Sequence, residues 1–376
     1  MTPLDPVVID TAGLSDLIGA LQRRGYRVVG PTLRDNAIVL AELDTADDLP
    51  HGWGVDVGPG TYRLRRRSDG AAFGHSAGPQ SWKQFLHPPR QRVWSTDAVL
   101  EEQPARYAFL GVRGCDLAAM GVLGRVLAGG DHPDSGYRGR RDGAFVVAVN
   151  CTEPGGLCFC SSMGTGPACA PGYDLVLTER VEGETVSYLV ESGSPAGAEV
   201  LAEVPRRAPA AGECAAAAEA VAAAAERMGR RMPEVDLRRL LIDSRESEHW
   251  GEVADRCLTC GNCTMVCPTC FCFTVEDTTD LTGQSAERWR RADSCFTTAF
   301  TFITSGSQRA SAKARYRQWL THKLATWQDQ FGSLGCVGCG RCITWCPVGI
   351  DLTAEVAALR AEEIGQPQPE AVLEMA

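Results

Sequence analysis

The chain has 376 residues, 44% of them hydrophobic and 22% charged, and carries a formal net charge of −10. This length and composition fit a folded protein of two domains and exclude a disordered chain. The acidic balance argues against nucleic-acid binding, which needs a basic surface, and no apolar run approaches the length that crosses a bilayer. The first residues, MTPLDPVVIDTAG, lack the charged start and apolar core of a secretory signal, so we expect a cytoplasmic protein without a membrane-embedded part.

Residues 1–206 are expected to form an α/β domain, in which helices cover a largely parallel sheet. Before residue 95 the pattern predicts a helix at 15–24 and strands at 37–41 and 62–66. Further along the chain, strands are expected to begin at Tyr173 and Thr185.

The pattern is strongest from residue 107. An apolar run at 107–112 ends at Arg113-Gly114-Cys115-Asp116, and an amphipathic stretch follows at 117–127. A second apolar run at 144–150 completes a strand-helix-strand unit, which predicts two parallel strands joined by a right-handed crossover.

Residues 207–234 are rich in alanine and predict a helical connector. A second domain, at 235–365, is expected to be helical and to resemble a bacterial ferredoxin with two clusters, followed by a tail at 366–376. Its predicted helices lie at 237–257 and 307–331. The second is basic, through Arg315, Arg317, His322 and Lys323 among others, and we expect its charges to offset those of the clusters.

Two cysteine runs of the form C-x2-C-x2-C-x3-C-P, which begin at Cys257 and Cys336, dominate this domain. In such a run three thiolates bind one 4Fe-4S cluster, and the cysteine before the proline binds the other cluster. The first cluster is therefore expected on Cys257, Cys260, Cys263 and Cys346. The second is expected on Cys336, Cys339, Cys342 and Cys267.

Zinc is the main alternative, but structural zinc sites use two C-x2–4-C pairs rather than a triple followed by C-P. Disulfides do not suit a chain without a secretory signal.

Four further cysteines predict a third 4Fe-4S cluster. Cys115 and Cys151 follow two predicted parallel strands, whose carboxyl ends share one edge of the sheet. Cys158 and Cys160 lie in the glycine-rich segment after Cys151, so the four thiols should face one crevice. The alternative is that they are small buried side chains of the core. Of the other cysteines, Cys169 and Cys214 look incidental. We expect three more to pack beside a cluster, with one able to replace an assigned ligand: Cys270, Cys272 and Cys295.

No pattern in the chain predicts an active site of its own. There is no dinucleotide-binding or Walker phosphate loop, and no histidine pair is spaced for metal catalysis. The turn at Arg113-Gly114-Cys115-Asp116 offers a thiol near a helix start, but no partnered base can be named for it.

Over residues 73–355 the chain resembles the iron-sulfur beta subunit of cytoplasmic sulfhydrogenases and NADP-linked nickel-iron hydrogenases, a family that includes the first subunit of anaerobic sulfite reductase. The resemblance rests on FLGVRGCD at 109–116, VNCTEPGGLCFCSSMGTGP at 149–167, CLTCGNCTMVCPTCFC at 257–272, RYRQWLTHKL at 315–324 and GCVGCGRCITWCPVGID at 335–351.

This resemblance implies a relay that passes single electrons from a flavin and NAD(P)-binding subunit to a catalytic module. That module would be the small and large subunits of a nickel-iron hydrogenase, which analogy favours, or the catalytic subunit of a sulfite reductase. Two other classes of function stay open: an assembly module whose clusters only stabilise the fold, and a self-contained reductase.

Overall fold

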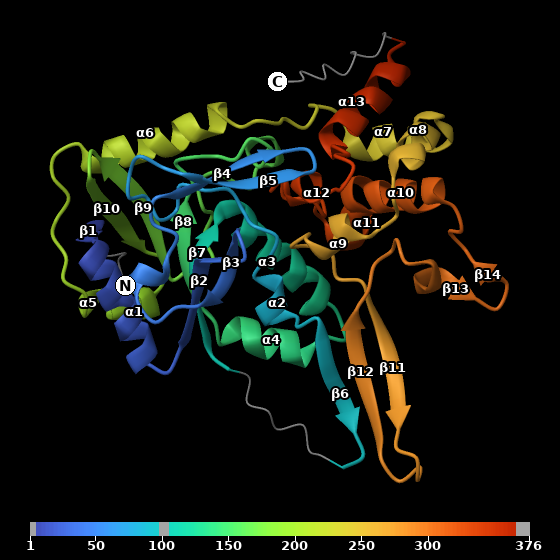
Figure 1. The fold of residues 1–376 in the computed structure, drawn as a ribbon, viewed down its shortest axis with the longest axis horizontal. Helices are drawn as coiled ribbons and strands as arrows, with labels where there is room; N and C mark the ends of the chain where they lie inside the picture. The colour runs from blue at the N-terminus through green and yellow to red at the C-terminus, as the bar shows by residue number, and fades with distance from the viewer. Residues whose placement is uncertain (1–4, 98–104, 366–376) are drawn as a thin grey trace.

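The computed structural model describes residues 5–97 and 105–365, so the tail expected at 366–376 lies outside the described residues. A large sheet with its helices forms one side of the molecule, a helical region forms the other, and an arm of three strands projects from the junction (Figure 1). Within the described residues, no helix is both long and apolar enough to cross a membrane.

The large sheet has seven strands in the order β1-β10-β9-β8-β7-β2-β3. They are β1 (Val7–Asp10), β10 (Thr185–Ser192), β9 (Leu175–Glu182), β8 (Phe145–Asn150), β7 (Tyr107–Arg113), β2 (Arg27–Arg34) and β3 (Ala37–Glu42). The four central strands, from β9 to β2, are parallel, whereas the outer pairings are antiparallel.

The prediction of a largely parallel sheet therefore holds only for the centre of the sheet. Both outer hairpins follow from tight turns. Asp35 and Asn36, with φ of 50° and 58°, form a two-residue turn between β2 and β3, and Gly183, with φ of 61°, lies between β9 and β10. Such turns reverse the chain directly, so the next strand must run antiparallel.

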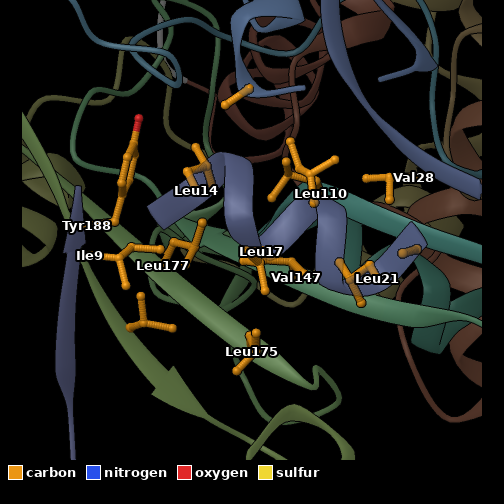
Figure 2. Close-up of a cluster of buried hydrophobic side chains, with 14 of the residues drawn as sticks. Ile9, Leu14, Leu17, Leu21, Val28, Leu110, Val147, Leu175, Leu177 and Tyr188 are labelled. Atoms are coloured by element: carbon orange, nitrogen blue, oxygen red, sulfur yellow. The ribbon is translucent and has the colours of Figure 1, made fainter. Parts of the chain in front are cut away.

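Helices α1 (Thr11–Arg23) and α3 (Gly114–Leu127) belong to two different apolar clusters of this sheet. Figure 2 shows Leu14, Leu17 and Leu21 of α1 facing side chains of the central strands such as Leu110 and Val147. Each fully buried leucine contributes about 1.5–3 kcal/mol, so this layer supplies much of the stability of the domain. The predicted strand-helix-strand unit is confirmed as β7, α3 and β8, although α3 begins three residues earlier than expected.

Shorter elements complete the first half of the chain. These are β4 (Trp53–Gly58), β5 (Thr61–Arg66), α2 (Lys83–Leu86), α4 (Ser135–Asp142), α5 (Pro195–Ala202) and the 3-10 helices η1 (Ala46–Asp48) and η2 (Ser161–Met163). The hairpin of β4 and β5 reaches the second cysteine run, because the Gly60 N–H donates to the carbonyl of Ile343 at 3.1 Å.

The helical region packs around a second core that includes Trp250, Tyr316 and Trp319. Its helices are α7 (Leu237–Asp243), η3 (Ser244–Glu246), α8 (His249–Arg256), α9 (Asn262–Met265), η4 (Thr298–Thr301), α10 (Ala312–Thr321), the π-helical turn η5 (His322–Thr326), α11 (Trp327–Phe331), α12 (Arg341–Thr344) and α13 (Leu352–Glu363). The connecting helix α6 (Glu213–Glu226) instead lies on the large sheet, where its Ala217 packs against Val8 and Leu189.

Two predicted helices are corrected. The helix expected at 237–257 is broken at Ser244, whose carbonyl accepts from the Trp250 indole N–H at 2.7 Å, so α7 and α8 are separate. The helix expected at 307–331 begins at Ala312, because Ser311 caps it by accepting from the Ala314 N–H. Residues before this cap form the short strands β13 (Phe302–Ile303) and β14 (Gly306–Ser307).

The second half of the chain is also less purely helical than expected. A hairpin of β11 (Phe273–Thr279) and β12 (Ala286–Ala292) forms the projecting arm, and β6 (Arg90–Ser95) from the first half pairs antiparallel with β12 (Figure 1). The hairpin is rich in charge and is stabilised by cross-strand pairs such as Arg288 with Asp277 at 2.7 Å. Its weak apolar alternation explains why the pattern did not predict it.

Buried His249 joins α8 to α13, since its Nε2 lies 2.8 Å from Glu355 and its Nδ1 lies 3.0 Å from Glu252. The hydrogen bond to Glu355 raises the pKa of His249. The stabilisation is therefore complete below the unfolded pKa of about 6.5 and is lost as the pH rises through the higher folded pKa.

We expect His249→Gln to lower the melting temperature more at pH 6 than at pH 9, with exposed His132→Gln as the control. Anaerobic melting followed by circular dichroism checks this. Equal losses at both pH values would contradict the assignment.

Candidate iron-sulfur sites

The first thiol group consists of the cysteines predicted for the first cluster: Cys257, Cys260, Cys263 and Cys346. All four line one cavity beside the aromatic side chains Phe296, Tyr316 and Trp319. Backbone N–H groups point at two of the sulfurs, from Thr259 to Cys257 at 3.4 Å and from Ile350 to Cys346 at 3.3 Å. Such donors stabilise negative charge on cluster ligands.

The second thiol group consists of Cys267, Cys336, Cys339 and Cys342. Each of the last three lies within electrostatic range of Cys267, although the two cysteine runs are far apart in sequence. The neighbouring Cys270 thiol and the Lys323 ammonium lower the pKa of Cys267 well below its usual range. Burial instead raises the pKa of Cys336 to about 12. Buried thiolates of this kind need positive charge, which the iron of a cluster supplies.

The third thiol group consists of Cys115, Cys151, Cys158 and Cys160. The structure brings all four to one cavity, at the edge of the sheet where β7 and β8 end. Arg113 donates to the Cys151 sulfur at 3.1 Å and to the Phe73 carbonyl at 2.9 Å. Burial raises the pKa of Cys158 to about 11, so an unliganded thiol here would stay protonated at neutral pH.

The second and third thiol groups are direct neighbours, because Cys339 also lines the cavity of the third group. Two glycines of the second cysteine run make this approach possible. A Cβ atom on Gly338 would lie 2.6 Å from the Cys160 backbone nitrogen, and one on Gly340 would lie 2.5 Å from the Leu157 carbonyl oxygen. The Phe159 N–H donates to the Gly338 carbonyl at 2.9 Å and fixes the contact.

A buried ion pair also joins the two halves of the chain beside these groups. The Arg341 guanidinium binds both carboxylate oxygens of Asp116, at 2.7 and 3.1 Å. Asp116 therefore has a partner in the second cysteine run, and this ion pair anchors the turn at Arg113-Gly114-Cys115-Asp116 beside the third thiol group. In this position the Arg341 guanidinium lies within electrostatic range of Cys339 of the second group and Cys115 of the third group.

Sequence reasoning missed one half-buried cation, Lys83, and did not single out buried Lys323 among the basic residues of its helix. The chain has only three lysines, and these two converge on the end of the first cysteine run. Lys83 Nζ donates to the carbonyls of Cys267 and Cys270 at 2.9 and 2.8 Å, and Lys323 Nζ donates to the Cys267 sulfur at 3.3 Å. In the sequence, only the rarity of lysine could have drawn attention to these two residues.

The predicted charge compensation by the basic helix thus depends mainly on Lys323. Arg315 lies within electrostatic range of Cys257 but donates to the Phe296 carbonyl, and Arg317 donates to the Arg245 carbonyl. His322 lies against Trp327 and Gln330.

The remaining five cysteines are not members of the three thiol groups. Cys169 donates to the Val149 carbonyl at 3.4 Å and does not line the cavity of the third group, and Cys214 is exposed on α6. Cys270 contacts Cys267, while Cys272 and Cys295 contact each other. Among the described residues, no group of three or more potential ligands is arranged around a single metal ion. In a 4Fe-4S cluster each thiolate binds its own iron, so the four ligands enclose a larger space.

The cysteine runs and their geometry define a protein with a 4Fe-4S dicluster domain, and residues 256–350 match the family of that description. Two 4Fe-4S clusters follow from this domain. The chain is also similar to sulfhydrogenase 2 subunit beta of Pyrococcus furiosus, with 31% identity over 280 residues that cover 72% of this chain and 79% of that protein. The chain therefore belongs to the family of iron-sulfur beta subunits of sulfhydrogenases, which confirms the resemblance seen in its sequence. No solved structure matches it.

Proposed function

We propose that the chain relays single electrons through three 4Fe-4S clusters, between a flavin and NAD(P)-binding subunit and the small and large subunits of a nickel-iron hydrogenase. The observation that carries this proposal is the continuity of the three thiol groups. Cys339 borders the cavity of the third group, and Cys342 borders that of the first. Electrons can therefore pass from the third cluster to the second and on to the first without leaving the protein.

Solvent exposure favours the first thiol group as the end of this route at which electrons enter or leave the protein. Cys260 is exposed there, and the exposed apolar side chains of Leu258 and Val348 line the same cavity. The third group is less exposed, since Cys115 and Cys160 are buried and Cys151 and Cys158 are half-buried. A partner would exchange electrons most directly at the first cluster.

We assign the ligands of the first two clusters to the first and second thiol groups, so that each run lends its fourth cysteine to the other. Cys267→Ser should then damage the cluster held by Cys336, Cys339 and Cys342, and Cys346→Ser should damage the other. Electron paramagnetic resonance of the dithionite-reduced variants distinguishes the two signals. Loss of the signal from the same run as the replaced cysteine would overturn the pairing.

The relay itself is tested with the anaerobically purified native complex. We expect its other subunits to include a flavoprotein and a hydrogenase. A reduced flavoprotein partner should reduce the clusters of the isolated chain, while the chain alone should not turn over a small acceptor. Clusters that do not cycle would indicate a structural module. Copurification of a sulfite reductase subunit would reassign the acceptor.

A further inference from the structure

Cys272 and Cys295 lie together at the base of the projecting hairpin. Phe273 pairs with Ala292 across β11 and β12, and the Asp293 N–H donates to the Cys272 carbonyl at 3.0 Å. Cys295 follows two residues later, so the hairpin itself brings the two side chains together. The two thiols are close enough to shift each other's pKa, which is lowered for Cys272 and raised for Cys295.

These two thiols are free of the ligand sets assigned above. Each of the three thiol groups already has four cysteines, and Cys270, the next cysteine in the chain, contacts Cys267 of the second group. Cys272 and Cys295 form a self-contained pair beside that group. The strand pairing of the hairpin brings them together, so their contact does not depend on a bound cluster.

Both side chains are half-buried, but only one of them lines a cavity. Cys272 lines a cavity of about 270 Å³ together with Lys83 and His87, whereas Cys295 does not line it. A small molecule that enters this cavity contacts Cys272 and not Cys295. This is the arrangement of an attacking thiol and a resolving thiol.

The surroundings of Cys272 favour its thiolate. The neighbouring Cys295 thiol lowers the pKa of Cys272, and the nearby charges of Lys323 and Lys83 act in the same direction. The same pairing raises the pKa of Cys295, so the proton of the pair resides on Cys295.

We propose that Cys272 and Cys295 are a redox-active dithiol, which reacts with a low-molecular-weight disulfide and closes into an intramolecular disulfide. The Cys272 thiolate attacks the incoming disulfide, its S–S bond breaks, and one thiolate leaves. Cys295 then gives its proton to that thiolate and attacks Cys272, which forms the Sγ–Sγ bond and releases the second thiolate. Two electrons pass from the dithiol to the reagent, which ends as one thiol and one thiolate.

The experiment uses the full-length, cluster-loaded protein, incubated without oxygen with oxidised glutathione, then alkylated and mapped by mass spectrometry. We expect peptides joined through Cys272 and Cys295, a loss of alkylation at both, and unchanged iron and sulfide content. In Cys295→Ser, Cys272 should retain glutathione as a mixed disulfide. Exposed Cys214 is the matched control, because it should gain glutathione without forming an internal disulfide.

Two results would overturn the proposal. One is that both thiols remain fully open to alkylation after exposure to the oxidised reagent, while Cys214 is modified. The other is that both are protected in the reduced protein and that Cys272→Ala loses iron, which would make them cluster ligands instead.

Discussion

Replacing Cys158 with serine should remove about four irons and four sulfides per chain, from about twelve of each to about eight. The reason is that Cys158 lines the cavity of the third thiol group together with the other three cysteines, and burial raises the pKa values of Cys115, Cys158 and Cys160 in the absence of metal. Iron and acid-labile sulfide measured on protein purified without oxygen checks this. The dicluster domain should keep its spectrum, because its ligands belong to the other two groups.

Cys169→Ser is the matched control for this variant. Its sulfur lies in the same part of the sheet but bonds to main-chain carbonyls and does not line the cavity, so its iron content should equal that of the parent. A parent protein with about eight irons would confine electron transfer to the dicluster domain and leave the third group as packed core thiols.

Lys323→Met should lower the reduction potential of the second cluster on the order of 50–100 mV. Lys323 is 3% exposed and donates to the Cys267 sulfur and to the Gly335 carbonyl. A reduced cluster carries one more negative charge than an oxidised one, so a buried ammonium at a ligand sulfur stabilises the reduced state more. A charged hydrogen bond contributes about 1.5–3 kcal/mol, and about 1.4 kcal/mol corresponds to 59 mV for one electron.

Redox titration followed by electron paramagnetic resonance measures both clusters in one sample. The first cluster should shift less, because its ligands lie farther from Lys323. Lys323→Arg should retain most of the parent potential, and Lys313→Met, at the start of α10, should leave both potentials unchanged. Equal potentials in the parent and in Lys323→Met would show that the ammonium does not tune the cluster.

Local spacing made several features of this chain predictable. The spacing of the cysteines in each run predicts which thiols bind one cluster, so the dicluster domain could be predicted from the sequence alone. The β7, α3 and β8 unit was predictable because its strands are short apolar runs and its helix has an apolar stripe. The outer hairpins of the sheet were not, because an apolar run does not reveal the direction of its neighbour, which short turns such as Asp35-Asn36 set.

The sequence by itself determined the iron-sulfur character of the protein, the family to which it belongs and the crevice in which Cys115 and Cys151 meet. Only the tertiary structure decided that Cys339 borders this crevice, that β6 completes the arm, and that Lys83 and Lys323 reach the end of the first cysteine run. The physical reason is the range of each interaction. Ligand spacing and apolar periodicity relate residues that are close in the chain. These contacts instead join residues far apart in the chain, and the type of each residue does not reveal which distant residue it contacts.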